Sequence, residues 1–503
     1  MTQDRYLPWL IPGILELSSV ARYFAFHAFL LDEYRARGLP PSMAELGRFI
    51  RASEWDLGLA VERCPRGCRY SPVGARRLRA LPDDLALLPR GESVQQALGG
   101  YGLYYRSPMI TLGLVARAGT MLGEEPTPID VLRPDSIRAR HVVEEYRHAV
   151  GDTKYVRRFL GGDEPLPAAV VQEYAERACL CRLLDSPTEQ VAVQAALFTG
   201  EPSADSEDDT LPRRRASVAH FLSLVSVTAD VAVDADEFRH RLWAANAVRG
   251  AAHQAVADRW AALAVKDIWQ EAMASVWADF CRRGLKQVRE LGRGLAPAEV
   301  RQLAADMLDG PPAIPAELST ADLADAIEAG TVVLTVDDET LDPSTSELEE
   351  MRAATVRLDT GSSAIVVLLE LARRTRGRTG DEWDAALDVA SNWQPSVRVA
   401  LAGFRQRTVT GESVADTLWW LLDHFVIGNH ERIAFSKLPD NTFRFRWEEG
   451  LLRFFDNGAH RFPVASVRHW PLRSLTLDLG LWENEDAPVL TPRGVAFVSE
   501  VFP

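Results

Sequence analysis

The chain has 503 residues, enough for roughly two to four domains with a large buried core. A hydrophobic fraction of 47% with 25% charged residues is typical of a globular protein and excludes a disordered or fibrous one. The net charge of −15 argues against a surface adapted throughout to nucleic acid, although it is compatible with a local basic face.

Residues 1–200 predict an N-terminal helical domain. Its first helix, expected over about residues 14–36, is apolar on almost all sides and should therefore lie at the centre of the domain. Arg22 and His27 in this helix have the spacing R-x(4–6)-H that is found in some helical ribonucleases. The simpler interpretation is that both side chains pack in the core. A catalytic pair of Arg22 and His27 is the alternative.

Four of the five cysteines fall in two short pairs, C-P-R-G-C and C-L-C. Their thiolates could together bind zinc, but the spacing within each pair differs from the usual C-x-x-C pattern. The spacing therefore favours buried free thiols, which pack like small hydrophobic groups. We expect no cofactor and keep a metal site only as an alternative, with the candidate ligands Cys64, Cys68, Cys179 and Cys181.

The segment of residues 17–34, L-S-S-V-A-R-Y-F-A-F-H-A-F-L-L-D-E-Y, is followed by E-W-D-L-G-L-A-V-E-R at residues 54–63. Together they resemble the start of large uncharacterised proteins found in bacterial phage-defence gene clusters. The resemblance covers about a tenth of the chain and is mostly aromatic. It implies a subunit or accessory of a defence assembly, and it carries over no catalytic residue.

A charged linker is predicted at residues 201–215, which begin with E-P-S-A-D-S-E-D-D. The following region, residues 216–296, is dominated by one long helix. We expect this helix at residues 236–291, because the stretch has no proline and its apolar residues recur at steps of three and four. Gly250 or Gly284 is the place where it would break.

The predicted long helix carries Trp269, Met273 and Trp277 beside its main apolar stripe. Such a helix must be covered by other helices. The two tryptophans therefore serve either packing or the docking of a partner, since tryptophan is a frequent anchor of protein interfaces.

Residues 297–410 predict an acidic helical region. Within it, V-D-D-E-T-L-D-P-S-T-S-E-L-E-E at residues 336–350 predicts a solvated loop. The run R-R-T-R-G-R is a local basic patch that could contact nucleic acid. The candidate contacts in this run are Arg373, Arg374, Arg376 and Arg378.

Residues 411–503 change character and predict a small α+β domain. Residues 442–448 alternate between aromatic and charged side chains, which is the period of a half-buried strand. Gly450 allows a turn, and residues 451–455 supply a second strand. D-N-G at residues 456–458 is a further hairpin signal.

Residues 470–502 resemble the closing part of a winged-helix domain. Leu479–Leu481 would end a short helix, Glu483–Asp486 would form the tip of a hairpin wing, and Leu490–Gly494 would start the last helix. The acidic tip would repel phosphate, so the resemblance favours a protein-docking module over a DNA-binding one. Candidate contacts to a nucleic-acid backbone are Arg468, Arg473 and Arg493.

The sequence thus predicts a mainly α, multidomain protein with helical bundles, a long central helix and a small C-terminal winged-helix-like α+β domain. It has no P-loop, dinucleotide-binding glycine pattern, nucleophile elbow or H-E-x-x-H motif. We expect a non-enzymatic scaffold or adaptor subunit of a bacterial multi-protein assembly, in anti-phage defence or a DNA transaction. The alternatives are a nucleic-acid-binding protein that uses the winged-helix-like domain and a helical ribonuclease.

The expected partners are other protein subunits of the same system, with DNA or RNA as further candidates. An odd number of cysteines and the lack of a signal peptide predict a reducing cytoplasm. No apolar run reaches the ~18–20 residues that a membrane-spanning helix needs, so no membrane association is expected.

Overall fold

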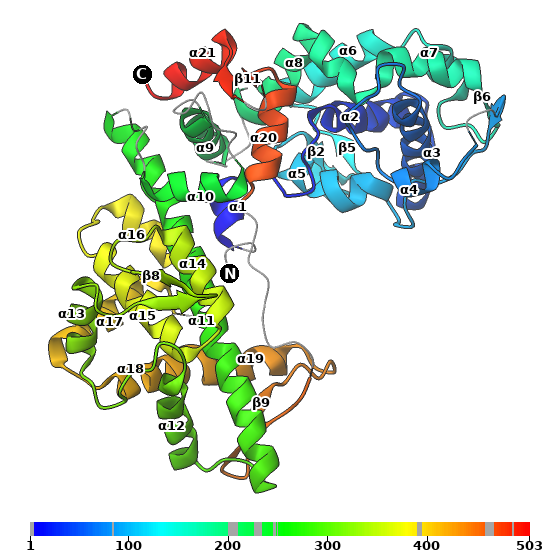
Figure 1. Cartoon of the computed structure of the whole chain (residues 1–503). Coiled ribbons are helices and arrows are strands. Elements are labelled where there is room, and N and C mark those ends of the chain that lie inside the picture. Colours follow the sequence, from blue (N-terminus) through cyan, green and yellow to red (C-terminus); the bar gives the residue numbers. More distant parts are fainter. Residues whose placement is uncertain are drawn as a thin grey trace. The chain divides into compact units, whose positions relative to one another are not determined.

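The computed structural model (Figure 1) describes residues 5–82, 85–199, 210–225, 234–244, 248, 250–389, 395–457, 467–484 and 487–503. Spatial contacts divide the chain into two compact units. Unit 1 consists of Met1–Leu7 and Asp234–Val467, and unit 2 consists of Pro8–Val233 and Arg468–Pro503. Both units are built mainly from helices with a few short strands, so the predicted mainly α class is confirmed. The finer division into five segments stays a prediction.

Unit 1 is organised around one helix, α11 (Gly250–Leu291), which contacts most of the other long helices of the unit. The remaining elements of unit 1 are α10 (Ala235–Ala244), α12 (Pro297–Asp306), η6 (Met307–Asp309), α13 (Thr320–Glu328), β7 (Leu334–Val336), β8 (Glu339–Leu341), α14 (Leu348–Leu358), α15 (Gly361–Arg374), α16 (Asp381–Asp388), α17 (Val397–Thr410), α18 (Val414–Leu421), η7 (Leu422–Ile427), α19 (Gly428–Ser436), β9 (Phe445–Glu448) and β10 (Leu451–Phe454).

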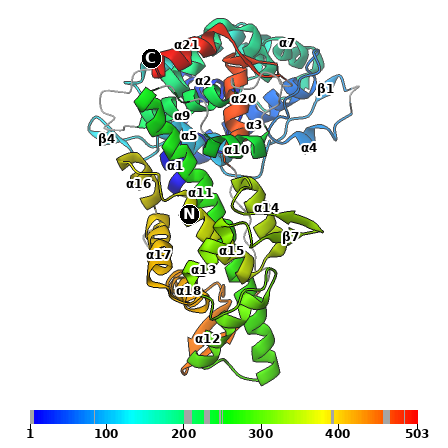
Figure 2. The same cartoon turned by 60° about the vertical axis from the view of Figure 1, so that its left-hand side comes forward.

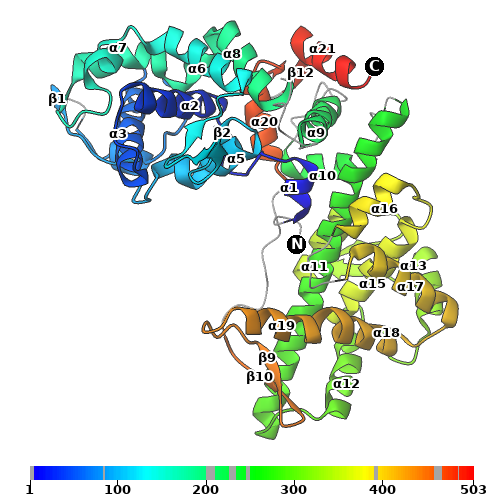
Figure 3. The same ribbon diagram turned by 180° about the vertical axis from the view of Figure 1, so that it is seen from behind.

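Helix α11 is 42 residues long and ends at Leu291, where the sequence predicts. It begins at Gly250, whose positive φ of 75° marks the break from α10, whereas Gly284 lies inside the helix. Helices α14, α15 and α16 pack along α11, and α13 and α17 pack against α15 (Figures 1 and 3). Although α11 is long, no helix in the described part of the chain is apolar enough to cross a membrane.

Unit 1 contains the hairpin that the sequence predicts at residues 442–455. Strands β9 and β10 pair antiparallel through a two-residue turn at Glu449 and Gly450, both with positive φ. Such a turn is the preferred connection in a tight hairpin. The second expected turn, D-N-G, lies partly outside the described residues.

The prediction of a solvated loop at residues 336–350 is wrong in part. Strands β7 and β8 form an antiparallel hairpin with Asp337 and Asp338 at its turn, both with positive φ. The hairpin lies beside α14 (Figure 2). Aspartate tolerates the left-handed conformation better than most residues, so the D-D pair that suggested a loop forms the turn instead.

Unit 2 is organised around α2 (Ala21–Ala36), which is buried on nearly all sides, as the sequence predicts. The other elements of unit 2 are α3 (Met43–Glu62), α4 (Ala75–Leu78), β1 (Leu87–Leu88), η2 (Tyr101–Tyr105), α5 (Arg106–Thr111), β2 (Val115–Ala116), β3 (Met121–Leu122), β4 (Glu125–Pro126), β5 (Val131–Leu132), α6 (Ile137–Val150), η3 (Tyr155–Phe159), β6 (Leu166–Pro167), α7 (Ala168–Ala178), η4 (Leu180–Asp185), α8 (Pro187–Gln194), η5 (Ala195–Thr199), α9 (Thr210–Val225), α20 (His469–Asp478), β11 (Trp482–Glu483), β12 (Val489–Leu490) and α21 (Pro492–Val501), while α1 (Leu7–Leu10) contains the boundary between the units.

Helix α9 begins at Thr210, inside the stretch predicted as a linker, so residues 210–215 are helical. Residues 201–209 of that stretch lie outside the described part of the chain.

The C-terminal segment joins unit 2 through a buried carboxylate. Asp478 at the end of α20 accepts hydrogen bonds from the backbone N–H of Ala21 at 3.1 Å and from Arg69 at 3.1 Å. The segment contains a helix, the β11–β12 hairpin and a last helix. Thr491 caps the last helix, because its side-chain oxygen accepts a hydrogen bond from the N–H of Gly494. This local order agrees with the expected one, but residues 485–486 at the expected wing tip lie outside the described residues. The winged-helix assignment stays a prediction.

We predict that Gly284→Ala destabilises unit 1. A methyl group at position 284 would overlap the ring of Phe454, which is itself held between Phe280 at 5.2 Å and Phe445 at 5.6 Å between ring centroids. Overpacking of this kind costs ~1–3 kcal/mol, more than the ~1 kcal/mol by which alanine favours a helix. Urea unfolding of the intact chain measures the difference.

Gly428→Ala is the matched control, because Gly428 is also helical and a methyl group there meets no atom within 4 Å. This control should leave the free energy of unfolding unchanged or raise it slightly. Equal effects of both substitutions would contradict close packing at Gly284.

Candidate functional site

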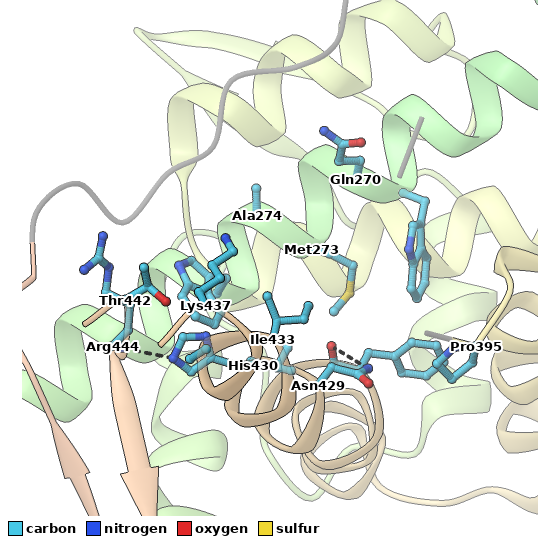
Figure 4. A pocket seen from close by; sticks show the side chains of 15 residues that line it. Gln270, Met273, Ala274, Pro395, Asn429, His430, Ile433, Lys437, Thr442 and Arg444 are labelled. Carbon is cyan, nitrogen blue, oxygen red and sulfur yellow. Dashed lines mark hydrogen bonds between the residues drawn. The ribbon is translucent and has the colours of Figure 1, made fainter. Parts of the chain in front are cut away.

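A cavity of about 530 Å³ in unit 1 is a candidate site for a ligand (Figure 4). It lies between α11 and the continuous helical segment η7–α19, and Thr442 and Arg444, just before β9, line it as well. Its volume falls in the usual range of ligand pockets. We call it the α11–α19 cavity.

The apolar wall of the cavity comes from Trp269, Met273 and Trp277, which succeed one another at every fourth position of α11 and so share one face. Phe425 and Ile433 line the opposite wall. Figure 4 shows Met273 pointing across the cavity toward Ile433. The three α11 residues are those that the sequence places beside the main stripe. The two tryptophans both pack and line the cavity, since Trp269 lies 5.3 Å from Phe425 and Trp277 lies 4.7 Å from His430 between ring centroids.

Three basic or titratable side chains line the other end of the cavity. The backbone N–H of Arg444 donates to Nε2 of His430 at 2.9 Å, so the proton of the neutral imidazole is on Nδ1 (Figure 4). Burial, together with the positive charges of Arg444 and Lys437, lowers the pKa of His430 to about 4. None of the described residues that line the cavity is acidic. The local field therefore favours an anion.

A π-helical turn shapes the floor of the cavity. The side-chain amide nitrogen of Asn429, in α19, donates to the backbone oxygens of His424 and Phe425 in η7 at 3.2 and 3.3 Å. These bonds fix the buried Asn429 side chain and leave its amide oxygen as an acceptor. Wide turns of this kind are frequent at functional sites.

The sequence alone does not identify His430, Arg444 or Lys437 as parts of a site. These residues follow Trp277 by more than a hundred positions, and no spacing rule links them to α11. One available signal was that Lys437 is one of only four lysines in an arginine-rich chain.

Arg22 and His27 lie in the core of unit 2, and both are only 1% exposed. The guanidinium of Arg22 donates two hydrogen bonds to Glu189, each of 2.8 Å, and a third to the backbone oxygen of Cys179 at 2.6 Å. All this bonding is internal, which is the arrangement that a buried charge requires. The geometry gives Arg22 a structural role. The acids Asp32 and Glu33, further along the same helix, bind Arg147.

His27 is enclosed by aromatic rings. Its ring stacks on Tyr23 with 5.6 Å between centroids, and Tyr101 and Tyr105 lie at 5.4 and 5.1 Å. Neither ring nitrogen has a hydrogen-bond partner among the described residues, and Glu54 is 3.8 Å away. Burial lowers the pKa of His27 to about 3, so the imidazole is neutral at pH 7.

The basic run at residues 373–378 is largely engaged within unit 1. Arg373 and Arg374 both pair with the buried carboxylate of Glu370, at 2.7 and 2.5 Å. Arg378 lies over the ring of Trp243 at 4.0 Å from the centroid. Arg376 is the exposed member of the run.

The C-terminal candidates are engaged within unit 2. Arg473 lies 5.7 Å from the ring centroid of Trp482. Arg493 donates to the side-chain oxygens of Gln190 and Gln194 at 2.9 and 2.6 Å. Arg468 is only 9% exposed. The two groups of predicted nucleic-acid contacts belong to different units. Arg373–Arg378 lie in unit 1, whereas Arg468, Arg473 and Arg493 lie in unit 2.

The four candidate metal ligands are brought together. The sulfur atoms of all four lie within 4.8 Å of one another in unit 2, although the spacing within each pair favours free thiols. The four residues are Cys64, Cys68, Cys179 and Cys181.

Comparison with known proteins adds no relative. The chain matches no protein-family model, and neither curated proteins nor solved structures show significant similarity to it.

We predict that His27→Phe makes the protein less sensitive to acid. The unfolded chain takes up a proton on this imidazole near pH 6.5, but the folded chain does so only near pH 3. His27 therefore lowers the free energy of unfolding as pH falls through this window, by up to ~1.4 kcal/mol per pH unit. Phenylalanine fits the aromatic surroundings and does not titrate.

Urea unfolding of the intact chain between pH 7 and pH 4 measures this effect. The wild-type and variant curves should converge at pH 7 and separate toward pH 4, with the variant more stable. Curves that stay parallel would mean that the folded chain protonates His27 as readily as the unfolded chain does.

Proposed function

We propose that the chain is a non-enzymatic scaffold or adaptor that docks a short segment of a partner protein in the α11–α19 cavity. The segment carries large apolar side chains and at least one carboxylate. The observation that supports this proposal is the lining of the cavity, which combines a tryptophan and methionine wall with basic groups and contains no acid among its described residues.

The dimensions of the cavity suit a peptide. Trp269 and Trp277 are eight residues apart on α11, which corresponds to ~12 Å along the helix axis. That length accommodates about two turns of a helix or three to four extended residues. Tryptophan, methionine and arginine are enriched in the centres of protein interfaces, and methionine adapts its shape to different partners.

Charge sets the orientation of the segment. Lys437 is exposed at the basic end, so a carboxylate of the partner can reach it without being fully dehydrated. In a chain of net charge −15, an acid-free cavity is a distinct place for an acidic partner to bind. Electrostatic complementarity of this kind fixes specificity more than affinity.

The two alternative functions have less support. A ribonuclease that used Arg22 and His27 would need both side chains to reach its substrate, and both are buried. Nucleic-acid binding by residues 373–378 would rest mainly on Arg376, because its neighbours pair with Glu370 or stack on Trp243.

The context of the adaptor is the one that the N-terminal resemblance implies, a bacterial phage-defence assembly, with a DNA-transaction complex as the alternative. The partners would be other subunits of the same system in the cytoplasm. The C-terminal helix–hairpin–helix, with its winged-helix-like order, would offer a second protein-docking surface on unit 2.

We predict that random peptides displayed on phage and selected on the intact protein are enriched in sequences that combine two or more large apolar residues with Asp or Glu. Met273→Arg should weaken an enriched peptide at least ~10-fold, because it places a charge in the apolar wall. Lys437→Glu should weaken it ~5-fold, as for a partly exposed ion pair. Fluorescence anisotropy of the labelled peptide measures both effects.

Arg432→Glu is the matched control for Lys437→Glu. It reverses an exposed charge in α19, the helix that Lys437 directly follows, at a position that does not line the cavity. It should leave the affinity unchanged. The docking proposal is wrong if Met273→Arg binds the selected peptides as well as the wild type does. It is also wrong if no peptide is enriched while an aromatic carboxylate such as 4-phenylbutyrate binds, since the cavity would then be a small-molecule site.

A further inference from the structure

We infer that Cys64, Cys68, Cys179 and Cys181 bind one structural zinc ion in unit 2. This site is separate from the α11–α19 cavity, which belongs to unit 1, so the inference does not depend on the proposed function.

The distances among the thiols suit a single ion. Cys181 Sγ lies 3.7 Å from Cys64 Sγ and 3.4 Å from Cys179 Sγ, and all four sulfurs are within 4.8 Å of one another. With zinc–sulfur bonds of ~2.3 Å, the sulfurs of a tetrahedral site are ~3.8 Å apart. A disulfide needs ~2.05 Å between sulfurs, and a cluster of several irons would hold four thiolates farther apart.

The first pair of cysteines is placed by a tight turn after α3. Gly67 in the sequence C-P-R-G-C has a φ of +62°, and its N–H donates to the backbone oxygen of Cys64 at 3.2 Å. A left-handed residue reverses the chain at this point, which glycine does at no steric cost. The turn therefore directs Cys68 back beside Cys64. Three residues separate these two cysteines, where the usual zinc-binding pattern has two.

The second pair is placed where α7 ends. Cys179 leaves the helical conformation with φ −52° and ψ 140°, and Cys181 follows in the tight helix η4. The backbone N–H of Arg182 closes the turn onto the oxygen of Cys179 at 2.8 Å. This bend brings both thiols of C-L-C to the same site, which a regular helix would not do for residues two apart.

Side chains outside the cluster hold both turns in place. Arg22 donates to the backbone oxygen of Cys179 at 2.6 Å while it pairs with Glu189. Arg66, inside the first turn, pairs with Asp185 just after the second at 2.6 Å. Such outer contacts orient the ligands of metal sites. The buried Arg22 is thus a positioning residue for this cluster.

The surroundings of the cluster explain why an ion would be useful there. Between Glu62 and Tyr101 the described residues form only the four-residue helix α4 and the two-residue strand β1. This irregular stretch has little secondary structure to hold it, and three of the four thiols are only partly buried. A zinc ion would cross-link it to the end of α7. With four thiolate ligands no position is left open for substrate, so the ion is structural.

Metal analysis of the intact protein tests this inference. Protein purified without chelators from zinc-supplemented cells should contain about one zinc per chain. The double variant Cys64→Ser, Cys68→Ser should retain less than a tenth of it. Cys281→Ser is the matched control, because Cys281 is the fifth cysteine and lies in α11 of unit 1. It should retain the full zinc content.

A second measurement uses the wild type alone, in the event that the double variant does not fold. Titration with p-hydroxymercuribenzoate should release zinc to a chromogenic chelator as four thiols react, and the fifth thiol should release none. The freed protein should also unfold at a lower temperature. Replacement of the bound zinc by cobalt should give the thiolate charge-transfer bands of a tetrahedral four-sulfur site.

Three results would overturn the inference. The first is a metal-free protein whose five thiols all react without releasing an ion. The second is a protein with only three reactive thiols, which would indicate a disulfide within the cluster. The third is iron in place of zinc after growth with both metals.

Discussion

The burial of α11 is the constraint on which unit 1 depends. A helix with large apolar residues on nearly all sides exposes them to water unless other elements cover the whole circumference. Helices α14, α15 and α16 cover most of it, and the β9–β10 hairpin packs against Gly284 near its end. The segment η7–α19 covers Trp269 and Trp277 through Phe425 and His430, and it leaves the α11–α19 cavity between these contacts. The candidate site is therefore a gap in the same packing that holds the unit together.

Unit 2 depends on a second constraint, which is that buried charges need partners. Arg22 meets Glu189 and the oxygen of Cys179, and Asp478 receives the N–H of Ala21 at the start of α2. The second contact attaches the C-terminal segment to the N-terminal helices. Burial raises the pKa of Asp478 to about 6 in spite of these hydrogen bonds. Arg22, a catalytic candidate by its spacing to His27, thus connects α2 to α8 and to the end of α7.

Arginine side chains make such internal contacts in both units. Arg373 and Arg374 neutralise Glu370, and Arg493 binds glutamine side chains of α8. The guanidinium group suits such roles because it stays charged and forms several directed hydrogen bonds. An arginine-rich sequence with a negative net charge thus uses many of its cations internally. The α11–α19 cavity differs from these internal pairs, because no described residue of its lining is acidic.

The sequence by itself determined the elements whose signal is local. The period of apolar residues predicted α11 to its last residue and the central burial of α2, and the alternation at residues 442–448 predicted β9, because these patterns depend only on neighbours along the chain. Tertiary structure decided what residues far apart in sequence do together. It enclosed His27 among aromatic rings, set His430 opposite Trp277, and gathered four cysteines whose pairwise spacing indicates free thiols. The turn at Gly67 and the end of α7 bring those thiols together, and contacts between separate segments leave no periodic mark in a single sequence.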